Sequence, residues 1–396
     1  MQAAMQCSRI VQSKLAPQVA MCFDSKRLVN QRLGEQLQAI HWKDVGWRHP
    51  PRLQQGGMAS RAWFFVGLTF LVLGFGVTPA IAATWSVQTG AAATGDLRDV
   101  SCISSTRCTA VGETGTSRGL IEVWDGSSWR LQEAAIPRET VRMALLAVSC
   151  TSERFCVAAG YYRLEAGSVF RPLVETWNGT AWSATTAFSP QAFDDVSCSS
   201  ERGCTVVGEG WVYRWNGTEW RTQSGTGIAG SISCKSETSC IAVGDEFNES
   251  FAIVPAAWSW NGTSWRRTTV SAPASARGLY NLSCSSSSFC MSISPATENF
   301  SERWNGSEWR QSTVPIAPLF ASNALSCTAT TFCAGMNHTT AAYWNGTEWS
   351  TETLPAPEGT ERAAVGISCT SSTACTLVGR YKERGGSFVP LIERYS

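Results

Sequence analysis

Residues 196–220 read VSCSSERGCTVVGEGWVYRWNGTEW, and versions of this stretch recur along the 396-residue chain. The stretch begins with two cysteines six positions apart and ends with an Asn-Gly pair flanked by tryptophans. Counted from the first cysteine of each version, successive copies lie 48, 48, 36, 50, 43 and 42 residues apart. A period of this length is typical of a propeller blade rather than of a leucine-rich or ankyrin repeat.

Each copy contains four short segments rich in Val, Thr and aromatic residues, separated by turn residues. In the second copy they are LLAVSC (145–150), CVAAG (156–160), FRPLVETW (170–177) and AWSATTA (181–187). Because no segment shows a convincing period of 3.6, each copy predicts four β-strands and no helix.

The two ends of the repeat region complete each other. The chain stops at PLIERYS (390–396), which matches a third strand, while ATWSVQT (83–89) matches a fourth strand without its first three. Joining them makes a seventh blade and removes the free edges of an open sheet. We therefore predict an all-β fold, a single seven-bladed β-propeller over residues 83–396 with four-stranded blades, closed by one N-terminal and three C-terminal strands.

The turn between the third and fourth strands carries Asn-Gly in five copies and Asp-Gly in the first. These dipeptides favour a two-residue type I′ turn, in which both central residues have positive φ. Such a turn would place Trp215 opposite Thr218 and Tyr213 opposite Trp220, with both tryptophans on one face as diagonal neighbours. We expect them to fill the space between adjacent sheets.

The cysteines predict one disulfide in the first hairpin of each blade, because opposed residues of antiparallel strands approach the separation that a disulfide needs. Each bridge would contribute roughly 2 kcal/mol in the chain-entropy model. Cys7 and Cys22 fit no pattern. The expected pairs are Cys102 with Cys108, Cys150 with Cys156, Cys198 with Cys204, Cys234 with Cys240, Cys284 with Cys290, Cys327 with Cys333, and Cys369 with Cys375.

Residues 58–82 have the pattern of a signal peptide: Arg61, an apolar run from Trp63 to Val77, and Ala80-Ile81-Ala82 before the cleavage point. We expect Met58 to be the true initiator and residues 1–57 to be a disordered extension from a misplaced start. The alternative is a basic cytoplasmic tail with an uncleaved anchor at 63–82. Export into an oxidising compartment agrees with the paired cysteines, so the protein is expected to be secreted, free of the membrane once cleaved, and monomeric.

The repeat, SC-x5-C-x-A-V-G followed by W-N-G-x-x-W, resembles the unit of many uncharacterised secreted proteins of actinobacteria and, more distantly, of Kelch and galactose-oxidase-type propellers. The resemblance covers the whole of residues 83–396. It implies the fold and an extracellular address but no activity, because propellers carry unrelated functions. The fifth and sixth copies depart from the unit, with MSIS after Cys290 and AGMN after Cys333, which suggests distorted second strands there.

Several site chemistries are poorly supported. Residues 83–396 contain one histidine, His338, which is too few for a copper oxidase, a histidine-dependent triad or a two-histidine zinc site. WDGSSW (124–129) lacks the residue between Asp and Gly that a sialidase Asp box has. Asn-x-Ser/Thr sequons coincide with the turns, which explain them without glycosylation. We therefore expect no metal and no cofactor.

The charge of the repeat region argues against nucleic acid as a partner. Residues 1–82 hold nine basic and three acidic residues out of 32 and 31, which leaves 23 basic against 28 acidic, a net charge of −5, for the rest. Only two of those basic residues are lysines. A nucleic-acid-binding domain is expected to carry a basic footprint instead.

Function is expected in the connections between strands two and three and between blades, which vary in length and composition. The binding candidates are Tyr161, Tyr162, Arg163, Glu246, Phe247, Lys382 and Arg384. They suggest a module that binds an extracellular glycan or protein. The alternatives are a secreted glycosidase or lyase that uses loop carboxylates, and a structural protein of the cell envelope.

Overall fold

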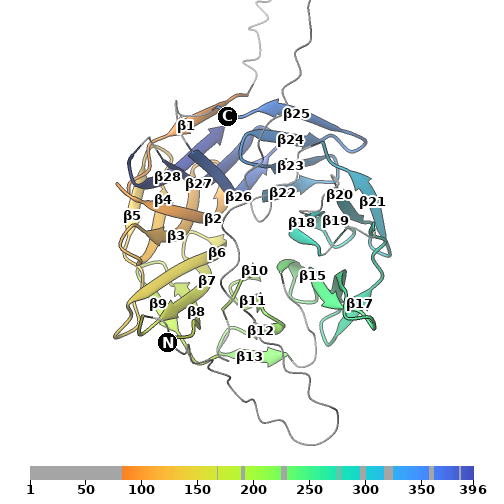
Figure 1. The fold of residues 1–396 in the computed structure, drawn as a ribbon, viewed down its shortest axis with the longest axis horizontal. Coiled ribbons are helices and arrows are strands. Elements are labelled where there is room, and N and C mark those ends of the chain that lie inside the picture. The colour runs from red at the N-terminus through yellow and green to blue at the C-terminus, as the bar shows by residue number, and fades with distance from the viewer. Residues whose placement is uncertain are drawn as a thin grey trace, which may run out of the picture. The chain divides into compact units, whose positions relative to one another are not determined.

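The described part of the chain is an all-β propeller of seven four-stranded antiparallel sheets (Figure 1). The structure is a computed structural model, and it describes residues 83–396 except 167, 189–191, 224–229, 274–275, 277, 295–299, 316–323, 356–360 and 383–384. The first strands of neighbouring blades lie against one another all the way round the ring. The predicted fold class is confirmed.

The strands follow the repeat in chain order. Blade 1 is β2 (Gly95–Ser104), β3 (Arg107–Thr114), β4 (Gly119–Trp124) and β5 (Trp129–Gln132). Blade 2 is β6 (Arg142–Ser152), β7 (Phe155–Arg163), β8 (Arg171–Trp177) and β9 (Trp182–Thr185). Blade 3 is β10 (Asp195–Ser200), β11 (Gly203–Gly208), β12 (Trp211–Trp215) and β13 (Trp220–Gln223). Blade 4 is β14 (Ser231–Ser236), β15 (Ser239–Phe247), β16 (Ile253–Trp260) and β17 (Trp265–Thr268).

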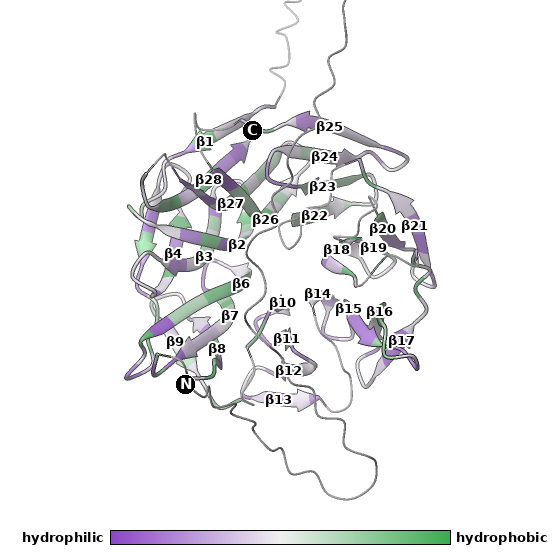
Figure 2. Ribbon diagram, viewed as in Figure 1, coloured by the Kyte–Doolittle hydropathy of each residue, from purple (hydrophilic) through white to green (hydrophobic). Residues whose placement is uncertain are grey.

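Blade 5 is β18 (Tyr280–Ser286), β19 (Phe289–Ser294), β20 (Phe300–Trp304) and β21 (Trp309–Thr313). Blade 6 is β22 (Ala324–Ala329), β23 (Phe332–Met336), β24 (Thr340–Trp344) and β25 (Trp349–Thr353). Blade 7 is β26 (Glu361–Ser371), β27 (Ala374–Lys382), β28 (Phe388–Tyr395) and the N-terminal β1 (Trp85–Gln88). The outer strands bury little beyond their tryptophan, and β21 is accordingly hydrophilic in Figure 2, whereas β6 is rich in hydrophobic residues.

Blade 7 closes as the sequence predicts. Strand β1 lies beside β28 (Figure 1) and pairs with it antiparallel. Trp85 is directly opposite Tyr395 in this pairing. The two rings are 5.4 Å apart, as the paired tryptophans of other blades are, for example 5.7 Å for Trp215 and Trp220. Trp85 also donates from Nε1 to the Tyr343 hydroxyl of blade 6 at 2.6 Å. One strand from the start of the repeat region thus locks the ring.

The serine before each first cysteine joins neighbouring blades. Its hydroxyl accepts a hydrogen bond, of 2.8 to 3.2 Å, from the amide N–H of the first cysteine in the next blade, and the seven bonds form a complete ring. Without this hydroxyl a buried amide would lose its partner. The serines are Ser101, Ser149, Ser197, Ser233, Ser283, Ser326 and Ser368.

All seven predicted disulfides are present. Each joins directly opposed residues on the first and second strands of its blade, with Cα atoms 3.9 to 4.0 Å apart, so the bridges hold the register of each first hairpin. The bonded pairs are Cys102 with Cys108, Cys150 with Cys156, Cys198 with Cys204, Cys234 with Cys240, Cys284 with Cys290, Cys327 with Cys333, and Cys369 with Cys375.

The surroundings of Cys375, in blade 7, differ from those of its six equivalents. Cys375 is bonded to Cys369 as predicted, and its side chain is buried, at 3% exposure. On the third strand, however, it lies opposite Tyr395, whereas the second cysteine of every other blade lies opposite a tryptophan. The third strand of this blade, β28, ends in tyrosine, as the sequence PLIERYS (390–396) already shows. That tyrosine packs on the tryptophan of β1 and on Tyr343 of blade 6.

The prediction of a two-residue type I′ turn is wrong. Trp215 pairs directly with Trp220, so the register differs by two residues from the predicted one. The Asn216 side-chain oxygen accepts hydrogen bonds from the amides of Thr218 and Glu219, both at 2.9 Å. Of the dipeptide, only the glycine after Asn216 has a positive φ, 94°. The asparagine therefore stabilises the turn through hydrogen bonds to its side chain, which is the pattern of an Asx turn.

The predicted distortion of the second strands in blades 5 and 6 is wrong as well, because β19 pairs with β20, and β23 with β24, without a register shift. In other blades the fourth residue after the second cysteine is glycine. At Gly112 a Cβ atom would lie 2.0 Å from the Asp96 carbonyl oxygen. Blade 5 has Ser294 there, and its buried hydroxyl donates to the Gly278 carbonyl oxygen at 2.6 Å. In blade 5 the hydrogen bond from Ser294 therefore takes the place of the close contact between glycine and the first-strand backbone that blade 1 shows.

Candidate functional site

The two sides of the ring differ in chemistry. The turns between strands one and two, and three and four, lie on one side, here called the cysteine face; the remaining connections lie on the other, here called the loop face. The cysteine face repeats the same disulfide and Asx-turn units. Residues that differ between blades gather on the loop face, and rigid scaffolds usually carry their function in such variable connections.

A cavity of about 810 Å³ occupies the part of the central channel nearest the loop face. It is lined by the beginnings of the first strands of all seven blades. In blades 1, 2, 5 and 7 the first strand carries a β-bulge at this level, and all four bulged residues line the cavity: Arg98, Leu146, Asn281 and Val365. Bulges re-aim side chains in this way beside functional sites.

Buried carboxyl groups line the cavity but hold the blades together. Asp99 accepts a hydrogen bond from the Val148 amide at 2.8 Å, and Asp195 accepts one from the Ile232 amide, also at 2.8 Å. Burial raises the pKa of Asp99 to about 7 and that of Asp195 to about 6, against the opposing effect of these hydrogen bonds. Asp99 and Asp195 thus each connect the first strand of one blade to that of the next blade.

A second acidic group lies on the blade 3 to blade 5 side of the cavity. Asp194 has a pKa raised to about 6 by burial and by the nearby Glu209. Tyr280 donates from its hydroxyl to Asp245 at 3.1 Å, and burial, with Asp245, raises the pKa of Tyr280 to about 12. A carboxyl that titrates near neutrality can exchange protons with a bound molecule.

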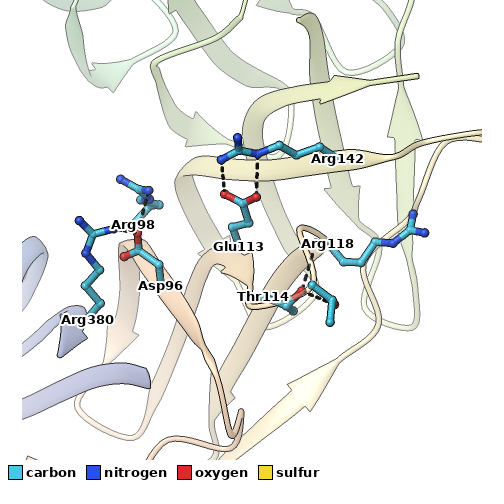
Figure 3. Close-up of polar contacts among 8 residues, drawn as sticks. Asp96, Arg98, Glu113, Thr114, Arg118, Arg142 and Arg380 are labelled. Atoms are coloured by element: carbon cyan, nitrogen blue, oxygen red, sulfur yellow. Dashed lines mark hydrogen bonds and ion pairs between the residues drawn. The ribbon is translucent and has the colours of Figure 1, made fainter. Parts of the chain in front are cut away.

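Arginines dominate the opposite side, over blades 7, 1 and 2 (Figure 3). Asp96 lies between Arg98, at 2.7 Å, and Arg380, at 2.9 Å. Arg142 forms two hydrogen bonds with Glu113, at 2.8 and 3.0 Å. We call Arg98, Arg142 and Arg380 the arginine arc.

The arc presents positive charge to solvent, because its arginine side chains are 36 to 37% exposed whereas those of the paired acids are 11 to 12% exposed. Burial raises the pKa of Asp96, and the two arginines beside it oppose that rise. Guanidinium groups held by buried acids keep their outer N–H donors available for an anionic ligand.

Exposed apolar side chains also concentrate on the loop face. Eleven large hydrophobic residues of the described chain are exposed, and eight of them lie in loop-face connections or strand ends: Ile136, Val141, Val169, Phe170, Trp211, Phe247, Phe251 and Ile253. Clustering of this kind is typical of interaction surfaces, whereas single exposed apolar residues are ordinary.

Three of the eight lie on one hairpin, the part of β15 and β16 over residues 245–255, here called the blade 4 arm. Phe247 is 68% exposed and Phe251 is 86% exposed. Phe251 has a φ of 59°, which is rare for a bulky residue. The Asn248 side chain accepts hydrogen bonds from the amides of Ser250 and Ala252, both at 2.9 Å, and holds the tip in this shape. The arm therefore presents two exposed aromatic side chains on a hydrogen-bonded turn.

The structure places the predicted residues of β7 in two environments. The Tyr161 ring lies 4.4 Å from the Phe170 ring, and the Arg163 guanidinium lies over the same Phe170 at 5.4 Å. Tyr162, in contrast, is buried in the core between blades 1 and 2, at 6% exposure. Its side chain packs against the protein rather than facing solvent.

The other predicted residues lie on blades 4 and 7. Glu246 forms an ion pair with Arg267 of the outer strand, next to the exposed Phe247. The Lys382 ammonium lies 5.4 Å from the centre of the Phe388 ring. Arg384 falls outside the described residues. The predicted set is thus divided among three blades rather than gathered at one point.

Sequence reasoning missed the arginine arc and Phe251. The arc comes from strand residues, whereas the candidates were drawn from loops. Arg98 stands four residues before Cys102, where blade 3 has Asp194 and blade 5 has Tyr280. Alignment of the copies on their cysteines would have shown that this cavity-lining position varies.

Within the described ranges, no group of three or more His, Cys, Asp or Glu residues is placed to hold a metal ion. The same ranges contain no helix long and apolar enough to cross a membrane. His338 lies on the loop face of blade 6, where burial, together with Arg362 and Arg380, lowers its pKa.

Comparisons with known proteins support the architecture. No protein-family model matches the sequence, and no curated protein does. Among solved structures, one described as "YCF48 bound to D1 peptide" is similar with a TM-score of 0.53 and 14% identity, over 81% of this chain and 99% of that one. YCF48 from Cyanidioschyzon merolae is similar with a TM-score of 0.53 and 12% identity, over 79% and 98% of the two chains.

At these identities the likeness shows the fold alone. The protein is a seven-bladed β-propeller with a hairpin disulfide in every blade. Seven disulfides are typical of a protein that folds in an oxidising environment.

Proposed function

We propose that this propeller is a secreted interaction module that binds a protein segment across its loop face. Export would use residues 58–82 as a cleaved signal peptide, with Met58 as the initiator, and the propeller would act as an extracellular monomer. The resemblance of the repeat to secreted actinobacterial proteins and to Kelch-type propellers supports this extracellular location. The positions of Tyr161, Arg163, Phe247 and Lys382 on the loop face agree with a role in binding.

The concentration of exposed apolar side chains on the loop face carries the proposal. Eight of eleven such residues lie there, and two of the aromatic ones, Phe247 and Phe251, lie on the blade 4 arm, whose tip is closed by hydrogen bonds to Asn248. Aromatic and arginine side chains are enriched among the residues that contribute most to protein interfaces. A partner segment could therefore place apolar groups on the arm and carboxylates on the arginine arc.

The similar structure supports a peptide as the kind of partner, since that protein is described as bound to a D1 peptide. A propeller of related fold can thus hold a peptide. The sequence of the partner of the present chain does not follow from that likeness.

The proposal can be tested by binding to a peptide array, using the purified protein and a double variant, Phe247→Ser with Phe251→Ser. The matched control is Val87→Ser with Leu131→Ser, which removes two exposed apolar residues from outer strands. We expect the loop-face variant to lose peptides that the control still binds. Equal binding by both variants, or no peptide bound by the unaltered protein, would contradict the proposal.

A second candidate is a carbohydrate-active enzyme, which the acidic group at Asp194, Asp245 and Tyr280 favours. Raised pKa values beside a cavity are typical of acid–base catalysis. A glycan array followed by product analysis distinguishes the two functions. Glycan cleavage that Asp194→Asn abolishes would establish the enzyme, whereas glycan retention without cleavage would indicate a lectin-like module.

A further inference from the structure

A repeated arginine position fills the space between several pairs of blades near the cysteine face. It is the residue just before the aromatic residue that ends the third strand. Arg214, Arg303 and Arg394 occupy it in blades 3, 5 and 7. Their guanidinium groups lie over the third-strand tryptophan of the next blade, at 4.4, 5.6 and 4.4 Å from the ring centre. Each pair is a cation–π contact.

The contact between blades 3 and 4 shows how the guanidinium is held. Arg214 stacks on Trp260 and donates to the Glu237 carbonyl oxygen at 2.7 Å, with its other nitrogen 3.6 Å from the Cys240 sulfur. Trp260 donates to the same carbonyl oxygen at 3.1 Å. Arg394 donates in the same way to a carbonyl oxygen of blade 1, that of Ser105.

Between blades 1 and 2 the same surroundings are present without the arginine. Trp177, Glu153 and Cys156 stand where the tryptophan, glutamate and cysteine of blade 4 stand, and Trp177 donates to the Glu153 carbonyl oxygen at 3.0 Å. The arginine position is Val123. A cavity of about 190 Å³ lies here, lined by Val123 and those three residues among others.

Interfaces without a third-strand arginine are filled by other side chains. Phe155 packs between blades 2 and 3, and Ile241 packs between blades 4 and 5. Tyr343 stacks on Tyr395 between blades 6 and 7, at 5.7 Å. Between blades 1 and 2 the position equivalent to Ile241 is the shorter Thr109, which lines the cavity.

Arg107 lies at the rim of this cavity rather than over the tryptophan. Its guanidinium pairs with the Glu153 carboxylate at 3.1 Å, and the two side chains are 40 and 60% exposed. An exposed pair of this kind contributes little to stability and exchanges readily. The Glu153 carboxylate can therefore meet an incoming cation.

We propose that the cavity between blades 1 and 2 binds the guanidinium group of an arginine side chain from a partner protein. The guanidinium would stack on Trp177 and donate to the Glu153 carbonyl oxygen, with the Glu153 carboxylate at the entrance. This site lies on the cysteine face, so it does not depend on binding at the loop face.

The test uses N-acetyl-arginine amide as the probe, with ligand-observed NMR titration of the purified protein. We expect saturable binding with one site, and binding of N-acetyl-lysine amide about tenfold weaker, because ammonium lacks the planar stacking face. Val123→Arg and Thr109→Ile should each abolish binding. Both variants carry the residue found at the equivalent position of another interface, Arg214 or Ile241, so both are expected to fold.

Val87→Arg is the matched control, since it adds the same charge on the exposed outer strand β1 and should leave binding unchanged. Blocking by Thr109→Ile, which adds no charge, separates filling of the cavity from charge repulsion. The proposal is overturned if the arginine probe fails to bind, if the lysine probe binds equally well, or if the two filling variants still bind.

Discussion

At the residue scale, the serine before each first cysteine has the same partner in every blade, the amide of the next blade's cysteine. The sequence shows this serine as a constant neighbour of the cysteine but does not reveal its partner, which lies tens of residues away. The cysteines explain each hairpin, and the serines explain how the hairpins stand side by side.

Ser233→Ala should destabilise the propeller, because it leaves the Cys284 amide without an acceptor between two blades. We expect a loss of about 1–3 kcal/mol in the free energy of unfolding, measured by denaturant titration. Ser183→Ala, on an exposed outer strand, is the control and should change stability little. A Ser233→Ala protein as stable as the control would show that the ring of serine hydrogen bonds does not stabilise the fold.

Glu302 predicts a dependence of stability on pH. It is fully buried in β20, has no hydrogen-bond partner among the described residues, and burial raises its pKa from 4.5 to about 8. The folded state therefore holds a proton that the unfolded state releases at lower pH. Its contribution to stability is fully present below about pH 4.5 and is lost as the pH rises through about 8.

Glu302→Gln should remove this contribution. We expect thermal unfolding of the variant to depend less steeply on pH than that of the unaltered protein, since the other buried acids, such as Glu175, are the same in both. Glu308→Gln, in an exposed turn, is the control. Identical pH profiles for all three proteins would contradict the assignment of a neutral Glu302.

At the scale of the hairpin, sequence spacing predicted the four strands of each blade and every disulfide, that of Cys369 with Cys375 included. The prediction from the sequence failed at the Asn-Gly turn. The preference of Asn-Gly for type I′ turns rests on the backbone angles of the two residues and does not consider hydrogen bonds to the asparagine side chain. The Asn216 side-chain oxygen accepts hydrogen bonds from two backbone amides. The resulting turn shifts the strand register by two residues from the predicted one and brings Trp215 opposite Trp220. The face of the sheet is unaffected, because a shift of two preserves the alternation of side chains.

Removal of one disulfide should weaken one blade without opening the ring. Cys198→Ala with Cys204→Ala is expected to lower the free energy of unfolding by about 2 kcal/mol, the chain-entropy value for so short a loop. Denaturant titration under oxidising conditions measures this loss. Because the serine ring and β-pairing remain, unfolding of the whole protein by this change alone would mean that the disulfides, rather than the packing between blades, hold the ring together.

The candidate site was less predictable than the hairpins. The loops were found from their variation between copies, yet the position of each side chain depends on contacts across blades. Tyr162 was expected to contact a ligand and is buried between two sheets, because alternation along β7 turns it away from Tyr161 and Arg163. The bulge that directs Arg98 into the cavity has no signature in one sequence.

At the scale of the whole molecule, closure depends on a four-residue strand, β1. Trp85→Ala should cost about 3–5 kcal/mol, because it removes a buried indole and its hydrogen bond to Tyr343 of the neighbouring blade. Val87→Ala, exposed on the same strand, should have little effect. Calorimetry on both proteins checks this, and equal melting temperatures would show that β1 does not close the ring.

Charge is divided across the mouth of the cavity, with arginines over blades 7, 1 and 2 and the carboxyls of Asp194 and Asp245 over blades 3 and 4. A partner segment would therefore have one favoured direction on the loop face, with its acidic part toward the arginine arc. The arginine arc and the Asp194–Asp245 pair come from different blades, so this property belongs to the assembled ring.

The most direct test of binding at the loop face is hydrogen–deuterium exchange of the protein with and without a peptide selected on the array. We predict slower exchange in the blade 4 arm, residues 245–255, and in the loop-face connections of blades 1 and 2, with no change in the disulfide turns of the cysteine face. Protection confined to the cysteine face or the outer strands would contradict the proposed function.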